Sequence, residues 1–161
     1  MTDNKIQLKN ENILKLEIYT DQGEETGDFL EFDLEDIELP FKYQEIIDRL
    51  KKSRNKIKNQ FAIIDKKEDH KGKKLLSSNE EAKLRTLNDF YKEQAEIYNI
   101  FLGENGVEKL LHGRKMRWTT LMEIDEIIEK QIAPKLNATM EDITKKIKSK
   151  YSNKEEDNIL E

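Results

Sequence analysis

Hydrophobic and polar positions alternate twice in the first quarter of the chain. In ILKLEIYT, which begins at Ile13, and in FLEFDLED, which begins at Phe29, apolar side chains take every second position. A period of two is typical of a strand with one buried face. The segment between them, DQGEETGD, has two glycines and four carboxylates and is typical of a hairpin loop. The pattern predicts a β-hairpin over residues 13–36, after a flexible N-terminal segment over residues 1–12.

The spacing of apolar residues changes at Pro40, beyond which they recur by threes and fours as far as Ile64. Proline suits the first turn of a helix, because it has a fixed φ and no N–H to donate. The same stripe carries Arg54 between Leu50 and Ile57. We therefore expect a long first helix whose packing is polar in its middle.

A second long helix is predicted after the loop DKKEDHKGKKLLSSN. Ser78 and Glu81 have the spacing of a capping box, and Gly103 has the place of a residue that ends a helix. The short connection predicts that the first two helices form an antiparallel pair.

Three further helices follow in the pattern. GENGVEKLLHG predicts a short helix bounded by Gly106 and Gly113. MRWTTLMEIDEIIEKQIAP predicts a long one that stops near Ala133, before Pro134, with these residues inward: Trp118, Leu121, Ile124, Ile127, Ile128 and Ile132. Asn137 then reads as the N-cap of a last helix, whose stripe comprises Met140, Ile143, Ile147 and Tyr151.

These elements predict a mainly α fold (α+β), an N-terminal β-hairpin followed by an antiparallel bundle of about four to five helices. The bundle is expected over residues 40–151 and a disordered tail over 152–161, with one domain overall.

Composition narrows the function classes. Charged residues make up 39% of the 161 positions and apolar residues 35%, which predicts a thin core under a strongly solvated surface. There is no cysteine, so disulfides, thiolate nucleophiles and cysteine metal sites are excluded. We find neither an 18-residue apolar run nor the apolar region of a signal peptide, and we expect a cytoplasmic protein without a membrane segment.

The net charge of −5 is unevenly spread. Residues 1–41 carry 12 acidic and 3 basic side chains, whereas residues 42–75 carry 5 acidic and 12 basic ones. One interpretation is that the two segments neutralise each other within the fold. The other is that copies of the chain assemble, with the acidic strand face of one copy against the basic helix face of the next.

Candidate chemistry is sparse. His70 lies in a lysine-rich loop and His112 beside a glycine at a helix end, and neither has the spacing of a metal pair. The acidic runs at 21–28 and 33–38 could hold a divalent cation but lack EF-hand spacing, and a solvated outer face explains them better. GENG lacks the Lys-Ser or Lys-Thr of a P-loop. We predict no enzyme, no catalytic residue, no cofactor and no metal.

Two basic runs, at 49–58 and 66–74, could contact phosphates. A nucleic-acid reader usually adds a basic isoelectric point or interleaved aromatic residues, whereas the isoelectric point here is about 5.3. A solvated helix face and hairpin tip is the preferred interpretation, and nucleic acid is disfavoured as a partner.

The order of three segments resembles a known family. FDLEDIELPFKYQEIIDRLKK, NDFYKEQAEIYNIFLGENGVEKLL and QIAPKLNATMEDITKKIKSKY together resemble tail assembly chaperones of long-tailed, siphovirus-type bacteriophages and prophages, over roughly residues 29–151. The resemblance implies a holdase of the host cytoplasm that coats the helical tape-measure protein, helps recruit tail-tube subunits and is absent from the mature virion. It also implies that a longer, frameshifted product can exist.

A holdase needs apolar grooves between movable helices and no active site. The residues expected to line such a groove, and so to bind the partner, are Phe61, Ile64, Phe90, Tyr98, Phe101 and Trp118. We expect a homo-oligomer. Two alternatives remain: a structural tail-completion or connector protein retained in the virion, and a small helical regulator that binds nucleic acid.

Overall fold

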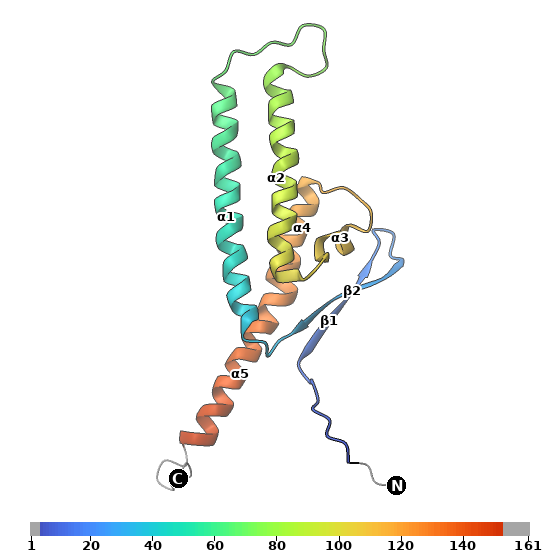
Figure 1. Ribbon diagram of the computed structural model, residues 1–161, viewed down its shortest axis with the longest axis vertical. Coiled ribbons are helices and arrows are strands. Elements are labelled where there is room, and N and C mark those ends of the chain that lie inside the picture. Colours follow the sequence, from blue (N-terminus) through green and yellow to red (C-terminus); the bar gives the residue numbers. More distant parts are fainter. Residues whose placement is uncertain (1–3, 153–161) are drawn as a thin grey trace. The chain divides into compact units, whose positions relative to one another are not determined.

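The computed structural model describes residues 4–152, which form a two-stranded hairpin and a series of helices (Figure 1). In chain order the elements are β1 (Ile13–Tyr19), β2 (Glu25–Asp33), α1 (Glu38–Asp65), α2 (Ser78–Leu102), α3 (Gly106–Leu111), α4 (Trp118–Ile127), the π-helical segment η1 (Ile128–Ile132) and α5 (Ala133–Ser152). The predicted fold class, mainly α with an N-terminal β-hairpin, is confirmed. The proposed tail at 152–161 lies outside the described residues apart from Ser152, which ends α5.

The chain divides into two compact units. Among the described residues, one unit contains 4–16, Glu31–Ile37 and 118–152, and the other contains Glu17–Leu30 and Glu38–Arg117. The first unit is thus built around α4, η1 and α5. The second is built around α1, α2 and α3.

The hairpin has the alternation that its sequence predicts. β1 and β2 pair with each other, and the side chains of Leu14, Ile18, Leu30 and Phe32 are buried. The turn is shorter than the predicted loop, because β2 already begins at Glu25. Gly27 therefore lies inside a strand, with a φ of +82° that other residues rarely adopt.

α1 and α2 lie side by side and antiparallel, as predicted (Figure 1). α1 starts two residues earlier than expected, so Pro40 occupies its first turn, where a missing N–H costs nothing. Near the connecting loop Lys83 forms an ion pair with Asp65. Near the opposite end the rings of Tyr43 and Phe101 meet edge to face, with centroids 5.6 Å apart.

The capping box of α2 is present one residue earlier than predicted. The Ser77 hydroxyl accepts a hydrogen bond from the Glu80 amide, and the Glu80 carboxylate accepts one from the Ser77 amide. Ser78, the predicted cap, is instead the first residue of the helix. The carboxylate of Asp69 accepts hydrogen bonds from the Asn79 amide and the Ser78 hydroxyl. The bond from the Asn79 amide, followed by those from Ser77 and Ser78, lowers the pKa of Asp69.

α2 ends at Leu102, and Gly103 follows it as predicted, with a φ of +97° and a ψ of 175°. The chain then turns directly into α3. The side-chain oxygen of Asn99 accepts a hydrogen bond from the Val107 amide at 2.8 Å, and its amide group donates to Glu108. Gly106 is buried in this turn.

Replacing Gly106 by alanine is expected to lower the free energy of unfolding by about 1–3 kcal/mol, as overpacked sites do. A Cβ atom at this position would lie 2.6 Å from the Cβ of Leu102, which the backbone of α2 holds in place. Urea denaturation would measure the loss. The matched control is Glu104→Ala, an exposed change in the same turn that should leave the midpoint unaltered. A Gly106→Ala midpoint equal to that of the parent would contradict this account of the turn.

The sequence-based division between the last two helices is wrong. α4, η1 and α5 are consecutive, with no break at Ala133, and Asn137 is an exposed interior residue of α5 rather than an N-cap. A proline within a helix normally clashes with the carbonyl four residues earlier. Here the turn before Pro134 is widened, and the Ala133 amide bonds to the Ile128 carbonyl five residues back. This π turn allows the helix to continue through the proline.

The inward stripe of this helix is confirmed at Leu121, Ile124, Ile128 and Ile132, which are buried. Ile127 is only half-buried, and Trp118, which was also expected inward, is 53% exposed at the start of α4. Within residues 4–152 no helix combines the length and apolar character that crossing a bilayer requires.

Candidate functional site

The six residues proposed from the sequence as a partner-binding set do not lie together on one accessible groove. Ile64, Phe90, Tyr98 and Phe101 are buried residues of α1 and α2. Phe61 is half-buried, and the amino group of Lys83 lies 5.6 Å from its ring centre. Trp118 belongs to the other unit. Five of the six thus belong to the α1–α2 pair, and the sixth belongs to α4.

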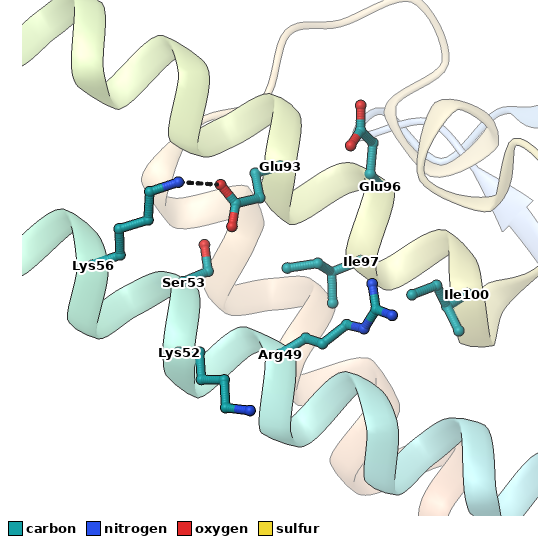
Figure 2. A pocket seen from close by; sticks show the side chains of 8 residues that line it. All are labelled: Arg49, Lys52, Ser53, Lys56, Glu93, Glu96, Ile97 and Ile100. Atoms are coloured by element: carbon teal, nitrogen blue, oxygen red, sulfur yellow. Dashed lines mark hydrogen bonds and ion pairs between the residues drawn. The ribbon is translucent and has the colours of Figure 1, made fainter.

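A surface groove does run between α1 and α2, with a volume of about 340 Å³ (Figure 2). We call it the α1–α2 groove. Its floor includes the buried Ser53 and Ile97. The remaining lining residues are Arg49, Lys52 and Lys56 from α1 and Glu93, Glu96 and Ile100 from α2. None of the six proposed residues lines it.

The charges of this groove are largely paired. Lys56 reaches across to Glu93 at 3.4 Å (Figure 2), while Arg49 pairs with Glu45 and Lys52 with Asp48 along α1. Such exposed pairs contribute at most about 1 kcal/mol each. Each of the three cations that line the groove thus has a carboxylate partner, as is usual on a solvated helix face.

Beneath the groove lies a set of hydrogen-bonded polar side chains, Ser53, Arg54, Gln94 and Tyr98, which we call the polar layer. Gln94 is 0% exposed, donates to the Ser53 hydroxyl at 2.9 Å and accepts from the Arg54 guanidinium at 3.2 Å. Arg54 also donates to the Tyr98 hydroxyl at 2.9 Å. The polar middle expected for the first helix is present, and α2 supplies matching partners.

The buried polar side-chain atoms of this layer are all hydrogen-bonded. No buried side-chain nitrogen or oxygen in the described part of the chain lacks a hydrogen-bond partner. Buried polar groups whose hydrogen bonds are all made specify one alignment of two helices, because sliding either helix would leave these groups without partners. The layer therefore fixes the register of α1 against α2.

The histidines and carboxylates were the sequence's candidates for a metal site. Among residues 4–152 no group of three or more histidine, aspartate or glutamate side chains is placed to hold a metal ion. His112 follows α3 in the left-handed conformation, the helix-terminal place predicted for it. His70 lies in the exposed loop between α1 and α2, and its backbone bonds to Ser78.

A different surface has the character of a docking site. The predicted stripe of the last helix, Met140, Ile143, Ile147 and Tyr151, is present on α5 and is here called the α5 stripe. Met140 and Ile143 are half-buried, whereas Ile147 is 56% and Tyr151 39% exposed. The outer half of the stripe is thus less covered than the inner half. Apolar anchors spaced by three and four are what a helix uses to pack against another helix.

The sequence did not predict the α1–α2 groove, and it predicted only part of the polar layer and of the α5 stripe. Arg54 and Gln94 each interrupt an apolar stripe, and this interruption was the sequence signal for the polar layer. Their pairing could not be predicted, because it depends on the register of the two helices. The α5 stripe was visible as a pattern. Its exposure was not, because a pattern does not reveal which part of a stripe is covered.

In comparisons with known proteins, no family model, curated protein or solved structure matches the chain.

Proposed function

We propose that this chain is a non-enzymatic binding protein that acts as a phage tail assembly chaperone, keeping the tape-measure protein soluble in the host cytoplasm. The observation that carries the proposal is the α5 stripe, whose outer half stays exposed on a helix that is otherwise strongly charged. An exposed stripe of this kind is an apolar surface to which a client helix can bind. The sequence resemblance to tail assembly chaperones supports the same role.

The arrangement of the rest of the chain is compatible with this role. The polar layer holds α1 and α2 in one register, so this pair does not offer the groove between movable helices that the sequence suggested, and the apolar surface available to a client is the one on α5. The heavy surface charge would keep a complex with an apolar client in solution. Recruitment of tail-tube subunits and assembly of several copies belong to the same proposal.

Co-expression with a tape-measure protein encoded beside this chain tests the function. We expect the tape-measure protein to move from the pellet to the soluble fraction and to co-purify with the chain. A matched culture expresses the tape-measure protein alone. Equal solubility in the two cultures would refute the chaperone role. Mass spectrometry of purified particles separates a chaperone, which should be missing, from a connector, which should be retained.

A further inference from the structure

The outer part of α5 combines the exposed apolar stripe with an excess of positive charge. From Ile143 to Ser152 the sequence ITKKIKSKYS contains four lysines and no carboxylate. We infer that this segment docks an amphipathic helix of a partner protein whose apolar stripe is bordered by acidic residues. The inference rests on the proposed function and deepens it, since it names the docking surface and the chemistry of the client.

The lysines lie where they would meet such a partner. Successive residues of an α-helix are about 100° apart, which puts Lys150 on one border of the α5 stripe and Lys148 on the other. The Lys150 amino group lies 5.5 Å from the ring centre of Tyr151, directly beside the stripe. Neither Lys148 nor Lys150 forms an ion pair with another of the residues 4–152, and each lies at a border of the stripe, where a carboxylate of a partner helix would come within reach.

Lys146 differs from these two. It forms an ion pair with Asp142 at 3.0 Å, and this bond, together with the nearby Glu35 and Glu11, raises its pKa. Its charge is thus already balanced within its own unit. Lys148 and Lys150, which have no ion pair to another described residue, lie in the last turns of α5, beside the exposed outer half of the stripe. Complementary charge at the borders of a helix interface selects the partner and speeds its association.

A protein helix fits this surface better than a membrane does. A membrane-surface helix presents a broad apolar face rich in Trp, Phe and Leu, whereas the α5 stripe is one residue wide, with spacings of three and four. That narrow seam is the geometry of helix-to-helix packing. A second copy of α5 fits less well than an acidic partner, because parallel pairing would set its lysines against lysines.

The test uses two synthetic helical peptides of about 25 residues, long enough to hold helical structure. Both carry the same apolar stripe. One has glutamates on its borders and the other has lysines. Titration of the full chain should show binding of the acidic peptide at least about tenfold tighter than that of the basic one, with a difference that shrinks as salt is raised.

Three variants make the assignment specific. Lys148→Glu/Lys150→Glu should reverse the preference between the peptides. Lys51→Glu/Lys58→Glu, an equal charge change at two exposed positions on α1, should leave it unaltered. Ile147→Ser should lower the affinity for the acidic peptide by about tenfold, because burial of one aliphatic side chain contributes about that much to binding. Because Ile147 is exposed, the variant should keep the far-UV circular dichroism of the parent.

Equal affinity for the two peptides, or no binding of either, would overturn the inference. So would α5-dependent binding to vesicles of anionic lipid without peptide binding, or an α5-dependent dimer that excludes the peptide. The proposed function is judged separately. If the Ile147→Ser variant still solubilises the tape-measure protein fully, the proposed chaperone function is supported and the α5 docking surface is refuted. If the acidic peptide binds as expected but the tape-measure protein stays insoluble, the surface stands and the function fails.

Discussion

Replacing Gln94 by leucine is expected to lower the free energy of unfolding by about 2–3 kcal/mol, although the new side chain is apolar and enters a buried site. The loss follows from the partners that remain. The Ser53 hydroxyl would lose the donor 2.9 Å away, and the Arg54 guanidinium would lose an acceptor at 3.2 Å. Ser53 is buried, whereas Arg54 is half-buried and keeps its bond to Tyr98. A buried polar group left without its partner costs about 1–3 kcal/mol.

Urea denaturation followed by circular dichroism measures this loss. Gln44→Leu, an exposed change of the same chemistry on α1, serves as the control and should alter stability by less than about 0.5 kcal/mol. The coupling with Arg54 is separable by a double-mutant cycle, in which Arg54→Leu and Gln94→Leu together should cost less than the sum of the two single changes, by about 0.5–3 kcal/mol. A Gln94→Leu variant as stable as the parent would show that the polar layer is dispensable.

Ile132→Ala is expected to cost about 2–5 kcal/mol, the range for removing a buried aliphatic side chain and leaving a cavity. Ile132 is 0% exposed and ends the π turn. The size of the loss depends on how far the neighbouring side chains can close the space. A widened turn held by Pro134 should relax little, which favours the upper part of that range.

The measurement is again the urea midpoint, with Gln131→Ala as the matched control. Gln131 precedes Ile132 in the same π turn but is exposed, so its truncation tests the backbone geometry without changing the packing. We expect that variant to lie within about 0.5 kcal/mol of the parent. Losses of equal size for the two variants would mean that the turn, and not the buried side chain, sets the stability of this segment.

The sequence predicted those parts of the fold in which local signals agree. Alternation specified the hairpin, and the helical period with Pro40 and Gly103 specified α1 and α2 to within a few residues. The failures arose where two signals competed. Ser77 and Ser78 both precede a glutamate by three residues, and only the geometry of the loop that contains Asp69 decides which serine caps the helix.

Pro134 is the second such case. Proline is a strong stop signal in an isolated sequence, but the buried isoleucines on its N-terminal side favour a helix that continues, and a widened turn reconciles the two. For the candidate site, the residue types of the polar layer and of the α5 stripe were visible. Their partners and exposure were not, because these depend on contacts between residues about 40 positions apart, such as Arg54 and Gln94, and on burial.

The π turn also bears on how this chain tolerates changes in its length. A π turn holds an extra residue relative to an α turn, and here it keeps the ring of Pro134 away from the carbonyl four residues earlier. Deleting the exposed Gln131 would return this turn to the α form and restore that clash, so the helix should kink or break at Pro134. A loss of one codon in this segment would thus be tolerated only together with a replacement of the proline.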